Sequence, residues 1–172
     1  MNPATLMDYS QIAAPPLSEG KAATGQASDL VVIDTKFGQI EFDRDFALNF
    51  PKGVPGFKGY NEFALARLPG HEDGNLLLLQ SIEPSDLSFV VIGYDAAAKL
   101  ITAEDIAEAQ RYLGIAPEDC AMMLIVRFEN RDGKVSMTVN LRAPLFLDTA
   151  NRLAWQHILA NESYQVRQPV EL

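Results

Sequence analysis

The segment from Phe50 to Phe57 restricts the fold more than any other part of the chain, because four of its eight residues are glycine or proline. Proline fixes its own φ angle and lacks a backbone N–H group, while glycine adopts the positive φ angles that tight turns need. The segment is therefore predicted to be a rigid loop of several turns, which either presents a surface to a partner or simply connects two strands. We expect both phenylalanines to anchor the loop ends in a core, with three outward-facing residues between them: Lys52, Gly53 and Val54.

The length and composition of the chain predict one globular domain. It has 172 residues, of which 48% are hydrophobic and 22% are charged, as is typical of a folded domain. The single cysteine, Cys120, excludes an internal disulfide framework and a cysteine-based zinc site, and we interpret it as a small buried hydrophobe. No apolar run reaches the roughly 20 residues of a membrane span, and the first residues do not resemble a signal peptide. A cytoplasmic location is therefore expected.

The charge of the chain favours some partners over others. Its formal net charge is −9, from 23 acidic and 14 basic residues. A negative field repels phosphate backbones, so direct binding to RNA or DNA is not expected. A basic protein is a favourable partner, because complementary fields accelerate encounter and select between partners.

Residues 1–28 and residues 29–172 differ in character. The first are rich in alanine, proline, serine, glycine and glutamine and lack sustained periodicity, so they are predicted to form a flexible, disordered N-terminal tail. In the remainder, about ten short strands at close spacing predict a mainly β fold. We expect a single small antiparallel β-barrel-like domain with one short helix.

Two hairpins are predicted within this domain. Residues 30–43 contain two strand-like runs joined near Gly38, and residues 122–129 and 134–141 are two runs joined by Asn130-Arg131-Asp132-Gly133. A short turn with glycine between alternating runs is typical of a hairpin, and Asp-Gly is a strong signal for one.

Other strands are predicted from continuous apolar runs. The runs at residues 76–79 and 89–92 have strand length and suggest strands that are buried on both faces. Further strands are expected at residues 62–68, 144–148 and 153–159, with a short one around residues 164–166.

One helix is predicted over residues 103–113. Thr102 can cap its first turn together with Asp105, as in a capping box, and Gly114 supplies the end. Its apolar stripe is narrow, so we expect the helix to pack on the outside of the sheet.

Residues with catalytic or metal-binding chemistry are sparse. Neither His71 nor His157 has a second ligand at the spacing that zinc requires. Glu83 and Asp86 could form an acid–base pair, but no nucleophile lies near them in the sequence. We interpret these two carboxylates as turn residues.

Two amides, Gln80 and Asn140, fall inside apolar strands. A buried amide without a partner costs about 1–3 kcal/mol. Each amide therefore either satisfies the backbone of a neighbouring loop or lies at an open edge or contact face of the sheet. The sequence leaves both interpretations open.

Four short motifs occur in order along the chain. They are Phe50-Pro51-x-Gly53-x-Pro55-Gly56-Phe57, Leu79-Gln80-Ser81-Ile82-x-Pro84, Thr138-x-Asn140-Leu141-x-Ala143-Pro144 and Tyr164-x-Val166-Arg167-x-Pro169. In these motifs the chain resembles the FliW family of flagellar assembly factors, over roughly residues 31–170.

The resemblance implies a monomeric, non-enzymatic β-barrel protein without a cofactor. It implies binding to CsrA, a small RNA-binding translational regulator, and antagonism of the repression that CsrA exerts on flagellin mRNA. It also implies binding to flagellin in competition with CsrA, so that free flagellin takes up the factor and releases CsrA. The partner-binding or motif residues that it marks are Phe50, Pro51, Gly53, Pro55, Gly56, Phe57, Gln80, Asn140, Ala143 and Pro144.

Two other functions fit the residues. A small-molecule-binding or hydrolytic β-barrel could use Gln80, Asn140 and a carboxylate such as Asp86, and it would need an internal cavity. A general chaperone would instead bind amphipathic helices of unrelated proteins in a hydrophobic groove.

Overall fold

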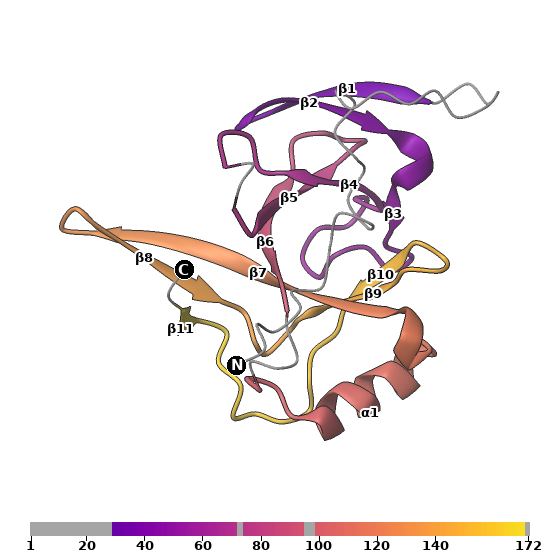
Figure 1. The fold of residues 1–172 in the computed structure, drawn as a ribbon, viewed down its shortest axis with the longest axis vertical. Coiled ribbons are helices and arrows are strands. Elements are labelled where there is room, and N and C mark those ends of the chain that lie inside the picture. The colour runs from indigo at the N-terminus through magenta and orange to yellow at the C-terminus, as the bar shows by residue number, and fades with distance from the viewer. Residues whose placement is uncertain (1–28, 72–73, 95–98, 171–172) are drawn as a thin grey trace, which may run out of the picture.

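The computed structural model describes residues 29–71, 74–94 and 99–170 (Figure 1). The predicted tail, residues 1–28, lies outside the described residues. Within these ranges the chain is mainly β with one α-helix, as expected. The strands are β1 (Leu30–Thr35), β2 (Gly38–Asp43), β3 (Leu48–Asn49), β4 (Glu62–Arg67), β5 (Leu76–Ser81), β6 (Ser88–Gly93), β7 (Cys120–Arg131), β8 (Lys134–Val139), β9 (Leu145–Asp148), β10 (Leu153–Gln156) and β11 (Gln168–Val170). The helices are α1 (Ala103–Leu113) and the short 3-10 helices η2 (Arg44–Phe46) and η4 (Pro117–Asp119).

Seven of the strands close a ring. They are paired in the order β7, β6, β5, β4, β3, β10 and β9, and β9 pairs with β7 to complete the circle. These pairs are antiparallel except β3–β10, which is parallel and pairs Asn49 with Leu153. The prediction of an antiparallel β-barrel-like domain is confirmed, with one parallel pair that was not expected.

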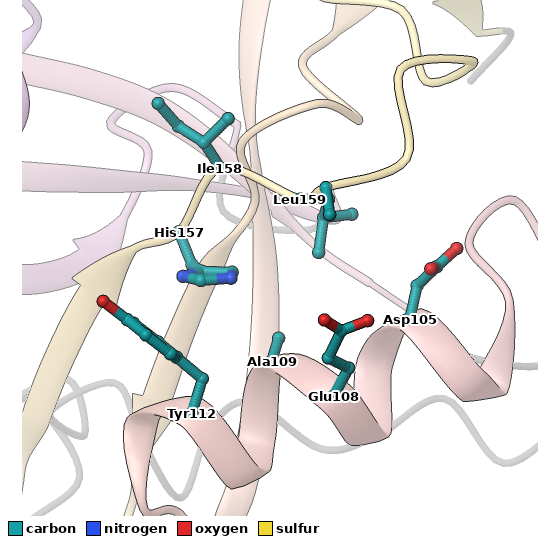
Figure 2. A pocket seen from close by; sticks show the side chains of 8 residues that line it. Asp105, Glu108, Ala109, Tyr112, His157, Ile158 and Leu159 are labelled. Atoms are coloured by element: carbon teal, nitrogen blue, oxygen red, sulfur yellow. The ribbon is translucent and has the colours of Figure 1, made fainter.

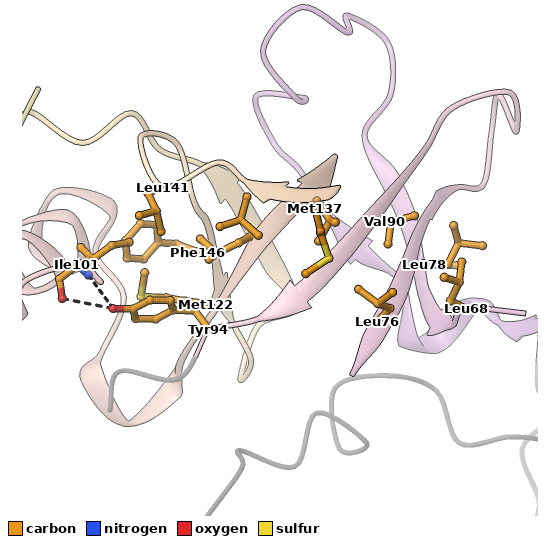
Figure 3. Close-up of a cluster of buried hydrophobic side chains, with 14 of the residues drawn as sticks. Leu68, Leu76, Leu78, Val90, Tyr94, Ile101, Met122, Met137, Leu141 and Phe146 are labelled. Carbon is orange, nitrogen blue, oxygen red and sulfur yellow. Dashed lines mark hydrogen bonds between the residues drawn. The ribbon is translucent and has the colours of Figure 1, made fainter. Parts of the chain in front are cut away.

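Strand β5 is buried along its whole length. Leu77 and Leu79 belong to the apolar cluster inside the ring, whereas Leu76 and Leu78 belong to a second cluster on its outside. Side chains alternate between the two faces of a strand, so a continuous apolar run requires cover on both faces. The outer cluster also includes apolar residues of β1, β2 and α1, and Figure 3 shows part of it.

The interior of the ring is filled by apolar side chains. They are Leu48, Phe50, Val54, Phe63, Leu65, Leu77, Leu79, Val91, Ala121, Met123, Leu145, Leu147 and Ala154. Phe50 and Phe63 pack edge to face, with 4.9 Å between their ring centroids. Within the described residues, this packing occupies the space where a small-molecule-binding or hydrolytic barrel would need its cavity.

Strand β7 belongs both to the ring and to a hairpin that projects from it (Figure 1). Residues from Cys120 to Ile125 pair with β9 and β6, and the following residues pair with β8. Asp132 and Gly133 connect β7 to β8 with positive φ angles of 54° and 79°. The hairpin predicted from the Asp-Gly pair is therefore confirmed.

The strand predicted around residues 164–166 is misplaced, because β11 begins only at Gln168. Tyr164 is engaged elsewhere: its hydroxyl donates a hydrogen bond to the Asp105 carboxylate at the start of α1. The chain therefore runs past the start of α1 before it pairs with β8 as strand β11.

The strand predicted at residues 153–159 is also shorter than expected and ends at Gln156. The next residues bond to the connection between β8 and β9 instead. The His157 N–H donates to the Pro144 carbonyl at 3.1 Å, and the Leu159 N–H donates to the Arg142 carbonyl at 2.9 Å.

Helix α1 begins and ends where the sequence predicts. Thr102 Oγ1 accepts the Asp105 N–H at 3.2 Å, and Gly114 ends the helix in the left-handed conformation, with φ 73°. Ala109 is the one buried residue of the helix, which therefore packs on the outside of the sheet, as expected. No helix in the described part of the chain is long and apolar enough to cross a membrane.

Candidate functional site

The Phe50–Phe57 loop folds back into the end of the ring. Phe50 is 1% exposed and Val54 is 4% exposed, and both belong to the interior cluster. Gly53 is buried with φ +65°, and its N–H donates to the Phe50 carbonyl at 2.9 Å. Gly53 and Val54 therefore face inward, contrary to the prediction, because the loop doubles back on itself. Lys52 is exposed, as expected.

Phe57 is not buried at the end of this loop. Its side chain keeps 38% of its surface exposed, so the expected second core anchor is wrong. Its ring packs edge to face on Phe89, with centroids 5.5 Å apart, and on Tyr60 at 6.4 Å. Phe57 thus lies at the surface and packs against the rings of Phe89 and Tyr60.

Gln80 holds the turn between β5 and β6. Its side chain is 1% exposed, and Nε2 donates to the carbonyls of Ser81 (2.9 Å), Ser85 (2.8 Å) and Leu87 (3.1 Å). The amide nitrogen carries two hydrogens, so one of them is shared between two carbonyls. The backbone of the adjacent turn satisfies this amide.

The two carboxylates of the same turn make structural contacts. Asp86 accepts a hydrogen bond from the Tyr60 hydroxyl at 3.0 Å, and this bond raises the pKa of Tyr60. Glu83 accepts from the Arg44 guanidinium at 2.6 Å. They therefore serve as anchors, and the Tyr60 bond ties the turn to the residue whose ring packs on Phe57. Across the described ranges, no three His, Cys, Asp or Glu side chains are grouped to hold a metal ion.

The segment from Asn140 to Pro144 is held separately. Asn140 Oδ1 accepts the Ala143 N–H at 3.0 Å, and the Ala143 carbonyl accepts from Gln156 Nε2 at 3.1 Å. The Asn140 amide thus satisfies a neighbouring loop backbone, as Gln80 does. Its other described bonds reach β7, the residues after β10 and the segment that leads to β11, where the Gln165 carbonyl accepts the Leu141 N–H at 3.0 Å; none of these bonds joins it to the Phe50–Phe57 loop.

The predicted site residues divide by exposure. Those that are buried or bonded inside the fold are Phe50, Gly53, Gln80, Asn140, Ala143 and Pro144. Those that are exposed lie on one loop and are Pro51, Pro55, Gly56 and Phe57. Only the second group offers exposed surface to a partner, and its role in binding stays a prediction.

A second candidate surface, which sequence reasoning missed, lies beside α1 (Figure 2). We call it the α1 groove; it has a volume of about 170 Å³ and is lined by Asp105, Glu108, Ala109, Tyr112, His157, Ile158, Leu159 and Ala160. The Tyr112 ring packs against the His157 ring with 5.2 Å between centroids, yet it remains 72% exposed. Burial lowers the pKa of His157, which favours the neutral imidazole. The one sign of this groove in the sequence is Tyr112, an aromatic residue of the helix that lies outside its apolar stripe.

Comparisons with known proteins agree with this architecture. The model of the family described as FliW protein matches residues 31–170. The flagellar assembly factor FliW of Syntrophotalea carbinolica is 32% identical over 140 residues, which cover 80% of this chain and 96% of that protein. The one of Thermoanaerobacter pseudethanolicus is 34% identical over 140 residues, covering 80% and 91%. A crystal structure of the flagellar assembly factor FliW superposes with a TM-score of 0.62 at 25% identity, covering 81% of this chain and 95% of that one.

Proposed function

The chain belongs to the FliW family of flagellar assembly factors, and from this premise we propose that it controls flagellin synthesis by binding two proteins in turn. One partner is the translational regulator CsrA, whose repression of flagellin mRNA it antagonises. The other is flagellin, which competes for the same factor. The family match across residues 31–170, which include the whole ring, is the observation that carries this proposal.

The charge of the chain supports CsrA as a partner. A protein that binds RNA presents basic surface, and this chain has a net charge of −9. Opposite fields accelerate encounter, so an acidic protein can engage the regulator without contacting RNA. When free flagellin accumulates, it takes up the factor, CsrA is released and flagellin synthesis falls. Because translation takes place in the cytoplasm, the factor acts there. It acts as a monomer, without a cofactor and without a catalytic step.

Within the Phe50–Phe57 loop, Phe57 is the residue most suited to contact a partner. Aromatic side chains dominate the binding energy of protein interfaces, because they bury a large area at low entropy cost. The ring of Phe57 is 38% exposed and is supported from below by Phe89 and Tyr60. A rigidly held aromatic ring loses little freedom when a partner covers it.

The experiment mixes the purified chain with CsrA and follows complex formation by size-exclusion chromatography and titration calorimetry. We expect a stable complex at low salt that weakens at high salt, because screening shortens the reach of surface charges. Adding flagellin should displace CsrA. Failure to co-elute at low salt would reject the proposal.

A matched pair of variants tests the contribution of Phe57. Phe57→Ala should weaken one of the two complexes by about tenfold, as truncation of an aromatic contact does. Phe37 is 39% exposed, close to the 38% of Phe57, but lies between β1 and β2. Phe37→Ala should therefore leave both affinities unchanged, and equal effects of the two variants would argue against this loop as a contact surface.

A further inference from the structure

The α1 groove has apolar side chains both within it and beside it. Ala109 is 1% exposed and Leu159 is 2% exposed, and both line the groove. Tyr112 and Ile158, which also line it, are 72% and 60% exposed. Large exposed apolar side chains around a hollow are typical of a surface that a partner covers.

The charge within the groove is negative. Glu108 and Asp105 rise from the helix into it (Figure 2). Asp105 is engaged, since it accepts hydrogen bonds from Tyr164, Thr102 and Asn161. In the part of the chain that the structure describes, the Glu108 carboxylate has no hydrogen-bond or ion-pair partner. Glu108 is therefore the group that can receive a positive charge from outside.

The size of the groove limits what can enter it. Pockets that hold drug-sized ligands have volumes of about 300–1,000 Å³, whereas the α1 groove has about 170 Å³. This space suits one long side chain and excludes a whole helix. Tyr112 and His157 close one end of the groove with packed rings, Asp105 lies at the other end, and Glu108 lies between them (Figure 2).

We propose that the α1 groove receives an arginine side chain from a basic protein partner. The aliphatic stem of the arginine lies over Ala109, its guanidinium pairs with Glu108, and the exposed ring of Tyr112 covers its flank. Arginine fits better than lysine, because its planar guanidinium stacks on aromatic rings and forms paired hydrogen bonds with a carboxylate. This inference deepens the proposed function, on which it rests for the choice of a basic partner.

The first test is an NMR titration of the full-length, ¹⁵N-labelled chain with the peptide acetyl-Ala-Arg-Ala-amide. We expect saturable shifts at Glu108, Tyr112 and Leu159. The same peptide with citrulline has the shape of arginine without its charge. It should bind at least about tenfold more weakly, because hydrogen bonds between charged groups are stronger than those between neutral groups. Equal binding of the two peptides, or the absence of shifts in the groove, would overturn the inference.

Variants assign the effect to the groove. Glu108→Gln should weaken arginine binding about tenfold, as the loss of a charged partner does, whereas Glu118→Gln should not change it. Glu118 is an exposed carboxylate of η4 and does not line the groove, so it controls for net charge. Unchanged arginine binding in Glu108→Gln would contradict the assignment.

Calorimetry with CsrA separates this inference from the proposed function. A complex that weakens in Glu108→Gln supports both. If CsrA binds Glu108→Gln and the unaltered chain equally well, the groove is not the docking point and the inference fails while the proposed function stands. If CsrA does not bind at all but the arginine peptide does, the proposed function fails and the arginine site stands. A dimer of this chain that is lost in Glu108→Gln would assign the groove to a second copy and overturn the inference.

Discussion

The Phe50–Phe57 loop and the α1 groove differ in how far their side chains are already engaged within the molecule. In the loop, Val54 is buried inside the ring, and Phe57 rests on neighbouring aromatic rings. In the groove, Tyr112 is 72% exposed, and among the described residues the Glu108 carboxylate has no bonded partner. Most of the loop therefore serves as scaffold, whereas the groove presents side chains that are exposed and make few contacts within the molecule.

A segment with a clear sequence motif and a segment with free binding surface are different parts of this fold. Glycine and proline mark positions where the backbone adopts a demanding conformation, so they make a segment recognisable. A groove between a regular helix and an extended segment needs no special backbone and leaves no motif. The Phe50–Phe57 loop is thus recognisable because of the backbone conformation with which it closes the ring, whereas the α1 groove is visible only in the structure.

The largest effect is expected at the buried end of the loop. Phe50→Ala should lower the free energy of unfolding by about 3–5 kcal/mol, as truncation of a buried phenylalanine does, since Phe50 packs on Phe63 inside the ring. Urea unfolding followed by circular dichroism measures it, with the exposed Phe37→Ala as the control, which should stay within about 0.5 kcal/mol. Similar losses in the two variants would show that the loop does not anchor in the ring.

A smaller effect is expected at Gln80. Gln80→Leu should lower the free energy of unfolding by about 1–3 kcal/mol, because the carbonyls of Ser81, Ser85 and Leu87 each lose the hydrogen bond that Gln80 donates. The control is Gln39→Leu, since Gln39 is exposed and donates to Asp34 on the surface hairpin. A thermal melt of Gln80→Leu that matches the unaltered chain would contradict a scaffold role for this amide.

The acidic start of α1 should show a pH-dependent effect. Hydrogen bonds, first that of Tyr164 and then those of Thr102 and Asn161, lower the pKa of Asp105 below its ordinary value of 3.8. Folding is therefore stabilised by this carboxylate above about pH 4, and the stabilisation is lost as the pH falls through the lowered pKa. Asp105→Asn should thus lower the melting temperature at pH 7 and should differ less from the unaltered chain as the pH falls toward 3. A difference that does not change with pH would argue against this carboxylate as the cause.

The smallest effect on stability is expected in the groove. Tyr112→Ala should change the free energy of unfolding by less than about 0.5 kcal/mol, as is usual for exposed positions. The same variant should lose the peptide shifts described for the α1 groove. A large loss of stability in urea would mean that Tyr112 is part of the scaffold, and the contrast between the two surfaces would disappear.

Local parts of the fold could be predicted from the sequence. Thr102 and Gly114 delimit α1, and Asp132 with Gly133 turns β7 into β8, because caps and tight turns act over a few residues. The run at residues 76–79 is buried on both faces, as predicted, because the alternation of side chains is a local property of a strand. In the run at residues 89–92, Val90 and Val91 are buried, but Phe89 and Ile92 are only half-buried.

The parts of the fold and of the candidate site that could not be predicted depend on contacts between segments that are distant in the sequence. The ring closes where Asn49 pairs with Leu153, and no local pattern specifies that pair. The inward position of Val54 follows from the bridge between Val54 and Phe57, which exists only once the loop has doubled back. The α1 groove needs α1 and residues 157–160 side by side, so it could not be read from either segment alone.

Strand β7 has an implication for how chain length can vary among relatives. Its twelve residues run without a break from the ring into the projecting hairpin. An insertion of one residue in its first half would exchange the inward and outward faces of everything beyond it. Evolution can therefore lengthen or trim the hairpin at its Asp132-Gly133 tip, while the root of the strand has to keep a constant number of residues.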